Sequence, residues 1–244
     1  MTLHHYFGVV IPLANEEKDF YAFIDALKAT MDQLPGGTVY LVVDKASKDN
    51  TLSLCRTLSE QDNRFVTVWA PENKSVVDAY RRGMREAFQR GHDYIIEMDG
   101  GLSHDPATLP HFLQTLKEGY DCAFGSRNIP GGSNANSPLH RRFLSTSGTL
   151  LANLLLGTRL RDMTSGYQGF QRRIVQKILD YPVRSTGHFY QTEIRYLLKK
   201  HSNREIPIHY HSPSPRVKMR SILNSLQTLG YYTLQKLRFR EIKL

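Results

Sequence analysis

The stretch "YIIEMDGGLSHDP", residues 94–106, combines a short apolar run with a single carboxylate at Asp99, two glycines and a proline. A short apolar run that ends in turn residues is typical of a strand buried on both faces of a sheet. The proline opens "PATLPHFLQTLKEG", whose apolar residues have helical spacing. The stretch therefore predicts a buried strand over 93–99, a turn that carries Asp99, and a helix behind it.

The same succession of strand and helix repeats along the first half of the chain. Buried strands are expected at 6–14, 38–44, 65–71, 93–99 and 120–127. Helical spacing between them predicts an α/β fold with a mainly parallel central sheet and helices on both faces. Ligands of open sheets bind beyond the carboxyl ends of the strands. The positions that fall at such ends are Pro12 to Glu16, Asp44, Asp99 and Arg127.

Length and composition set the broad class. With 244 residues, of which 40% are hydrophobic, the chain can bury one full core. No apolar run approaches the roughly 20 residues that span a bilayer, and the N-terminal residues lack a signal-peptide pattern. Cys55 and Cys122 lack metal or redox spacing, which indicates reduced thiols and a cytoplasmic location. No G-x-G-x-x-G, P-loop or H-E-x-x-H motif is present, which argues against dinucleotide, ATP and zinc sites.

Positive charge is concentrated at the C-terminal end. Residues 199–244 hold ten Lys or Arg against two acids, which accounts for eight of the nine net positive charges. Residues 219–244 predict a basic amphipathic helix beside a domain at 1–218, with Ile222, Leu226 and Leu229 on one face. We expect this helix to lie on an anionic membrane surface. Two alternatives are that it packs on the protein's own core or that it is simply a solvated basic helix. Nucleic-acid binding is not expected, because no recognition motif accompanies the charge.

Seven short motifs follow one another along the chain, and their order is more informative than any one of them alone. They are "VVIPLANEE", "VVDKASKDNT", "EMDGGLSHDP", "FGSRNIPGG", "RDMTSGYQGFQR", "YQTE" and "REIPIHY". This series resembles the family 2 glycosyltransferases of the GT-A fold, and among them the dolichol-phosphate (polyprenyl-phosphate) mannosyltransferases. The resemblance implies a Rossmann-like GT-A domain. It also implies inverting transfer of a sugar from a GDP-mannose-like or UDP-linked donor to a polyprenyl or dolichyl phosphate, with Mg²⁺ or Mn²⁺.

The resemblance also implies roles for individual residues, with Asp99 and Arg127 as the catalytic pair and Asp99 as the metal ligand. The implied donor-binding residues are Pro12, Asn15, Glu16, Asp44, Lys74, Asp99 and Gly100. The implied acceptor-binding residues are Arg127, Arg141, Ser145, Asp162, Ser165 and Lys218. Arginine suits the acceptor side because a guanidinium binds a phosphate bidentately and stays charged.

The chain departs from the family pattern at the donor side. Gly101 stands where a second acid is usual, Lys45 follows Asp44 in place of another Asp, and "KSVV" replaces a glycine-rich turn at 74–77. We therefore expect a reduced metal site in which Asp99 is helped by substrate phosphates and waters. On this interpretation Gly101→Asp should tighten metal binding, and Lys45 could supply part of the missing positive charge.

Two other functions remain open. A related transferase with a sugar hydroxyl as acceptor would need a general base, for which Asp105, Asp162 and Glu193 are the candidates. A lipid phosphate is already an anion and would need none. The third possibility is a catalytically weak homologue that only binds a nucleotide sugar. The sequence leaves the oligomeric state open.

Overall fold

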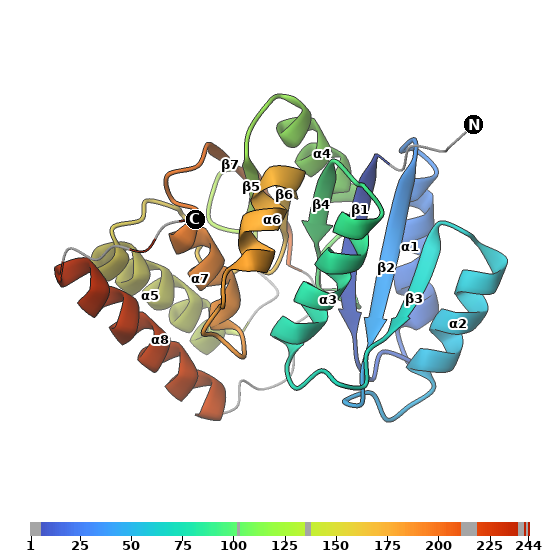
Figure 1. Ribbon diagram of the computed structural model, residues 1–244, viewed down its shortest axis with the longest axis horizontal. Helices are drawn as coiled ribbons and strands as arrows, with labels where there is room; N and C mark the ends of the chain where they lie inside the picture. Colours follow the sequence, from blue (N-terminus) through green and yellow to red (C-terminus); the bar gives the residue numbers. More distant parts are fainter. Residues whose placement is uncertain (1–5, 102, 135–137, 211–218, 239–241, 243) are drawn as a thin grey trace.

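The computed structural model describes residues 6–101, 103–134, 138–210, 219–238, 242 and 244, apart from the side chains of residues 140, 141 and 220. Its described strands form one sheet in the order β3-β2-β1-β4-β6-β5-β7 (Figure 1). The strands are β1 Phe7–Leu13, β2 Gly37–Val43, β3 Phe65–Trp69, β4 Tyr94–Glu97, β5 Cys122–Ser126, β6 Gln168–Gln171 and β7 Asn203–Pro207. Only β6 runs antiparallel to its neighbours, β4 and β5. The expected mainly parallel α/β sheet is confirmed.

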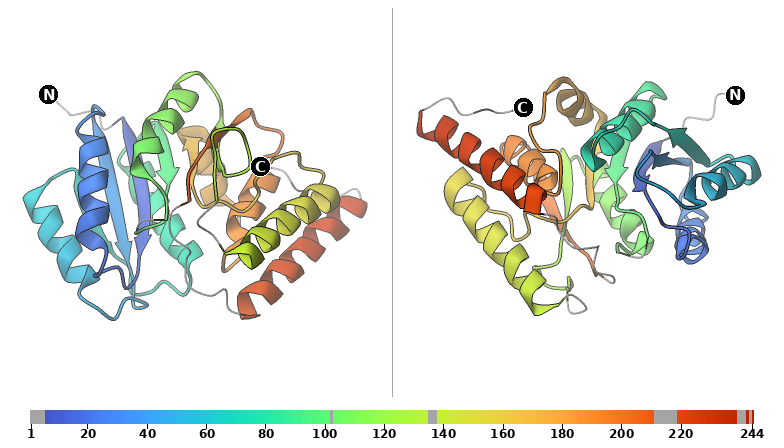
Figure 2. Two further views of the ribbon diagram at one scale, coloured as in Figure 1. Left: turned by 180° about the vertical axis from the view of Figure 1, so that it is seen from behind. Right: turned by 90° about the horizontal axis from the view of Figure 1, so that it is seen from below.

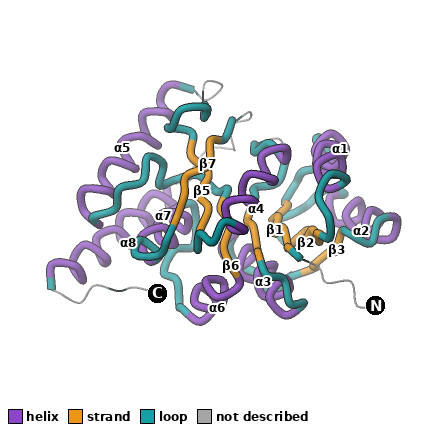
Figure 3. Tube along the Cα trace, turned by 90° about the horizontal axis from the view of Figure 1, so that it is seen from above, coloured by secondary structure: helices purple, strands orange, loops and turns teal. Residues whose placement is uncertain are grey.

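Helices cover both faces of this sheet. They are α1 Phe20–Met31, α2 Thr51–Gln61, α3 Val76–Gln89, α4 Leu109–Lys117, α5 Leu139–Leu156, α6 Arg172–Asp180, α7 Phe189–Leu197 and α8 Met219–Leu237, with a short 3-10 turn, η1, at Pro106–Thr108. Figure 3 shows α1 and α4 on one side of the sheet and α3 and α6 on the other.

The core explains why the early strands read as continuous apolar runs. In β1, Val9 and Ile11 pack into the cluster that contains α1 and α4. Val10 points the other way, into the cluster that contains α3 and α6. Both faces of the strand are therefore buried. The strands β6 and β7 were not predicted, because β6 is four residues long with Gln at both ends and β7 has only one buried residue.

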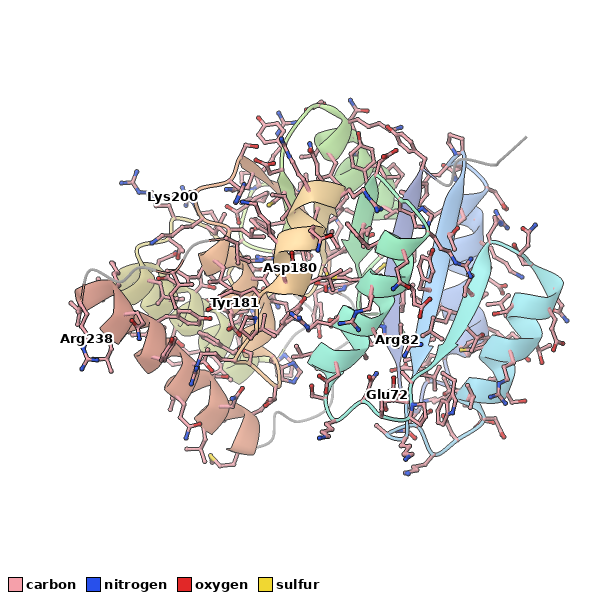
Figure 4. The ribbon with its side chains drawn as sticks, in the orientation of Figure 1. Glu72, Arg82, Asp180, Tyr181, Lys200 and Arg238 are labelled. Carbon is pink, nitrogen blue, oxygen red and sulfur yellow. The ribbon has the colours of Figure 1, made fainter. Side chains whose placement is uncertain are left out.

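Two arginines of α3 fix the position of this helix. Arg81 donates hydrogen bonds of 2.8–3.0 Å to carbonyls at the end of α6, including those of Leu179 and Tyr181. Arg82 binds Glu72 at 2.7 Å in the loop before α3 (Figure 4). Cations are favourable at helix C-termini, where unpaired carbonyls gather. The start of α3 and the loop before it are therefore held at the edge of the sheet.

The helices α5 and α8 lie side by side, away from the parallel half of the sheet (Figure 2). They join in a third apolar cluster with α7, in which Leu156, Leu229 and Tyr232 are buried. Packing on the protein's own core thus holds for one face of α8. Leu229, expected beside Leu226 on an outward face, points inward instead, whereas Leu226 is 55% exposed. Among the described residues, no helix has both the length and the apolar character needed to cross a membrane.

Candidate active site

A cleft of about 850 Å³ opens at the carboxyl ends of β1, β2 and β4. It brings together most of the residues that the sequence singled out. Those lining it are Pro12, Asn15, Glu16, Asp44, Lys74, Asp99, Gly100, Arg127 and Ser165. Ser145 and Asp162 lie behind Arg127, as described below. Lys218 and the side chain of Arg141 fall outside the described residues.

The loops after β1 and β2 are joined by one side chain. Asn15 has the left-handed φ of 60°, which Asn tolerates better than most residues. Its Nδ2 donates to the carbonyl of Ala46 at 3.1 Å, and its Oδ1 accepts from the N–H of Lys48 at 2.8 Å. Asp44 closes the turn at the end of β2 by accepting from the N–H of Ala46 at 2.7 Å. These bonds build one wall of the cleft.

The start of α3 forms another part of the cleft wall. Ser75 caps the helix, because its Oγ accepts from the N–H of Asp78 at 3.3 Å. Lys74, just before the cap, is exposed and lines the cleft. The positive end of a helix and a lysine on one wall favour an anionic ligand such as a diphosphate.

Asp99 is fixed by two residues that sequence reasoning missed. The Tyr80 hydroxyl donates a hydrogen bond to Oδ1 of Asp99. The N–H of Asp99 donates to Nδ1 of His104 at 3.2 Å, and His104 Nε2 lies 3.8 Å from Oδ2. The Asp99 side chain is still 35% exposed. Its carboxylate is therefore held in place while it faces the cleft. His104 stands in the quoted motif "LSHDP", which was the available signal.

A buried carboxyl group lies beneath this arrangement. Glu97 is completely buried and accepts hydrogen bonds from Tyr190 at 2.9 Å and Gln168 at 2.7 Å. Burial raises the pKa of Glu97 from 4.5 to about 8, although these two hydrogen bonds oppose the rise. The ring of Tyr190 stacks on that of Tyr80, with centroids 5.9 Å apart. Glu97 thus supports the residue that holds Asp99.

The space next to Gly101 is already filled. Gly101 has a φ of +70°, and a Cβ built on it would lie 2.8 Å from Oε2 of Glu16. Burial, followed by the charges of Asp19, Asp49 and Asp99, raises the pKa of Glu16. Lys45, in contrast, is exposed and is not among the residues that line the cleft. The expectation that Lys45 replaces the missing charge is therefore not supported.

At the end of β5, Arg127 lines the cleft and is bound to Asp162. Its Nε lies 2.7 Å from Oδ2 and its Nη2 lies 2.9 Å from Oδ1. Nη2 also donates to Ser145 at 2.9 Å and to Thr164 at 2.6 Å. Burial of Asp162 opposes its ionisation, but the charge and hydrogen bonds of Arg127 outweigh burial and hold the pKa of Asp162 well below its usual range.

The guanidinium of Arg127 is therefore only partly available to a ligand. Its Nη1 makes no hydrogen bond to any residue that the structure describes, whereas the other two nitrogens are engaged. A bidentate contact with a phosphate would therefore require Arg127 to give up at least one of the hydrogen bonds that it makes in this structure. Asp162 is completely buried, so it orients Arg127 instead of lining the cleft itself.

The three candidate bases do not reach the cleft. Asp105 accepts from the N–H of Ala107 and starts η1. Glu193 is completely buried and accepts from the N–H groups of Arg184 and Ser185, each at 2.8 Å, and from Tyr232 at 2.6 Å. Asp162, the third, is occupied by Arg127. None of the three lines the cleft.

Comparison with known families agrees with this geometry. The model of "Glycosyl transferase family 2" matches residues 8–179, more than half of the chain. The chain belongs to glycosyl transferase family 2. This family 2 member is 31% identical over 201 residues to "Undecaprenyl-phosphate mannosyltransferase" of Micrococcus luteus, covering 82% of this chain and 81% of that protein. It is 32% identical over 189 residues to "Polyprenol monophosphomannose synthase" of Mycolicibacterium smegmatis, covering 77% and 70%.

Solved structures show that this glycosyltransferase has a known fold. The glucosyl-3-phosphoglycerate synthase of Mycobacterium tuberculosis superimposes with a TM-score of 0.67 at 17% identity, covering 96% of this chain and 80% of that one. The same enzyme, crystallised with Mn²⁺, UDP and glucosyl-3-phosphoglycerate, gives a TM-score of 0.64 at 16% identity over 97% and 80%. At this identity the likeness supports the fold alone.

Proposed function

We propose that this glycosyltransferase moves a sugar, with inversion, from a nucleotide sugar to a polyprenyl phosphate. The relatives named above for undecaprenyl-phosphate and polyprenol substrates support the choice of acceptor. The observation that carries the proposal is the cleft itself. Both Asp99 and Arg127 line it, whereas the three candidate bases do not. This supports a donor site near the Asp99 carboxylate and an acceptor site near the Arg127 guanidinium.

The chemistry matches this distribution of charge. A phosphate oxygen of the acceptor attacks the anomeric carbon, and the bond between that carbon and the nucleoside diphosphate breaks on the opposite face. The nucleophile is already an anion, so no proton has to be removed. Catalysis then depends on positioning and on stabilising charge. Arg127 orients the acceptor phosphate through Nη1, and Lys74 lies where it attracts the donor diphosphate.

The donor side fits a divalent cation. Mg²⁺ and Mn²⁺ favour carboxylate and phosphate oxygens, and Mg²⁺ often uses only one or two protein carboxylates. Asp99 offers such an oxygen at the cleft, and when bound the ion would neutralise charge on the departing diphosphate. The described residues contain no group of three or more His, Cys, Asp or Glu side chains placed to hold a metal. Substrate oxygens and waters would complete the coordination.

A lipid acceptor also requires access to a membrane. One surface, here called the α5–α8 surface, combines exposed apolar side chains of both helices. They are Leu139, Phe143, Leu150 and Leu154 of α5 and Met219, Leu223, Leu226, Leu234 and Leu237 of α8, each more than half exposed. Exposed basic residues accompany it: Arg142 is part of α5, Arg159 follows that helix, and Arg238, labelled in Figure 4, follows α8. We infer peripheral attachment to the anionic, cytoplasmic face of a membrane through this surface.

One experiment tests the function directly. GDP-mannose and a panel of UDP-sugars are offered with a short polyprenyl phosphate, with Mg²⁺, Mn²⁺ or chelator, and the lipid product is identified by mass. Transfer from at least one donor is expected, and Asp99→Asn should abolish it. Asp25→Asn, an exposed carboxylate on α1, is the matched control and should remain active. Transfer to a sugar hydroxyl but never to polyprenyl phosphate would overturn the proposal.

A further inference from the structure

We propose that Glu16, from the loop after β1, is the second protein carboxylate of the donor-side cation site and does the work for which the family uses an acid at position 101. The inference rests on the metal dependence in the proposed function. It assigns a ligand from a different strand end, 85 positions away from Gly101 along the chain.

The sheet brings the two loops together. β1 and β4 are neighbouring parallel strands, so their carboxyl ends meet at the same edge. The loops then pack without a gap. A Cβ at Gly100 would lie 2.3 Å from a side-chain carbon of Leu13 and 2.9 Å from the carbonyl of Pro12. The two glycines after Asp99 therefore permit a close approach that other residues would block.

This approach places the Glu16 carboxylate in the space of a missing side chain. A Cβ at Gly101 would lie 2.8 Å from Oε2 and 3.5 Å from Cδ of Glu16. The backbone of Glu16 is itself fixed, because its N–H donates to Oγ1 of Thr51 at 2.9 Å. An acid at 101 and the acid at 16 would thus compete for one location, on which the charge of Asp99 also acts. The chain keeps two carboxylates there but takes the second from the first loop.

The charges around Glu16 point to a cation as the ligand. Its carboxylate makes no hydrogen bond or ion pair with any described residue, and it lines the same cleft as Asp99. The charges of Asp19, Asp49 and Asp99 all act on it. Half-buried carboxylates gathered without a paired cation are costly unless a positive ion joins them. A divalent cation that also binds the donor diphosphate meets this need.

The test measures Mn²⁺ binding to the full-length protein by electron paramagnetic resonance, with GDP or UDP present and no turnover. Wild type is compared with Glu16→Gln, and Glu17→Gln is the matched control. Glu17 is exposed in the same loop and binds Asn50 at 2.7 Å instead of facing the cleft. Glu16→Gln should weaken Mn²⁺ at least tenfold, whereas Glu17→Gln should leave it within twofold. Unchanged affinity in Glu16→Gln overturns the inference.

A rescue variant separates ligation from mere loop damage. Gly101→Asp alone should fail to tighten Mn²⁺ binding, because Glu16 fills the space and the φ of +70° strains any side chain. In Glu16→Ala the space is vacant, so adding Gly101→Asp should restore part of the lost affinity. A Gly101→Asp variant that binds Mn²⁺ tenfold more tightly than wild type would contradict the inference. A wild type that binds no Mn²⁺ with either nucleotide would instead overturn the metal part of the proposed function.

Discussion

The guanidinium of Arg127 donates two hydrogen bonds to the carboxylate of Asp162, from Nε to Oδ2 at 2.7 Å and from Nη2 to Oδ1 at 2.9 Å. Asp162 is completely buried, and the side chain of Arg127 is only 11% exposed. Arg127 therefore has two roles, because it pairs with a buried carboxylate and also lines the cleft. A simple alanine substitution at 127 changes both at once, so the two roles need separate experiments.

Arg127→Ala should lower the free energy of unfolding by about 3–5 kcal/mol, because it removes the guanidinium that pairs with the buried Asp162 carboxylate. The carboxylate would keep only its hydrogen bonds from the N–H groups of residues 127 and 164 and from the Thr164 hydroxyl. Urea unfolding measures the loss. The double variant Arg127→Ala/Asp162→Ala removes both charges and should be more stable than Arg127→Ala alone. If the free energy of unfolding of Arg127→Ala lay within about 1 kcal/mol of wild type, the ion pair would contribute little to stability.

The acceptor role is better tested with Arg127→Lys, which keeps the charge opposite Asp162. Lysine cannot hold Asp162 and present a second nitrogen to the acceptor. A charged hydrogen bond contributes about 1.5–3 kcal/mol, so the KM for polyprenyl phosphate should rise roughly tenfold or more. The KM for the nucleotide sugar should change little. Equal rises in both constants would remove Arg127 from the acceptor side.

Tyr80 is a positioning residue for Asp99. Tyr80→Phe keeps the ring that stacks on Tyr190 but removes the hydroxyl that binds Asp99. We expect kcat to fall roughly tenfold, in line with the loss of one charged hydrogen bond, while the melting temperature changes by only a few degrees. Steady-state kinetics at saturating substrates and a thermal melt measure the two effects. An unchanged kcat would show that Asp99 needs no such support.

Glu97 should make stability depend on pH. The unfolded chain releases this proton near the ordinary pKa of 4.5, whereas the folded protein retains it to about pH 8. Stability should therefore fall as pH rises through this window, by at most about 1.4 kcal/mol per unit from this group. The Glu97→Gln variant has no ionisable group at this position. Its stability relative to wild type should therefore increase from pH 5 to pH 8. Urea unfolding across this range measures it, with exposed Glu60→Gln as control.

The α5–α8 surface predicts binding to anionic liposomes at low salt. Removing residues 219–244 would test this poorly, because it also uncovers the core that contacts Leu229 and Tyr232. Charged substitutions on the exposed face are sharper: Phe143→Glu with Leu154→Glu, or Leu223→Glu with Leu226→Glu. Either pair should release the protein from sedimenting liposomes. Tyr21→Glu, which alters a side chain 67% exposed on α1, should not.

Sequence patterns predicted the features that depend on local burial. The five early strands were found because both of their faces are apolar, and the residues at their carboxyl ends do line one cleft. Short β6, with its flanking glutamines, gave no such signal. The relation of Glu16 to Gly101 was equally hidden, since it depends on two loops packing across strands. For that reason the structure favours no gain in metal affinity from Gly101→Asp, contrary to the expectation from the sequence.

The α5–α8 surface also has a consequence for biosynthesis. Its two helices come from residues 139–156 and 219–237, so the ribosome produces the second long after the first. Domains generally fold as units, and here α8 joins α5 only after residues 219–237 have been made. A nascent or interrupted chain would present α5 without its neighbour. Because the exposed apolar side chains come from both helices, we expect a chain without α8 to bind lipid more weakly than a chain that has both.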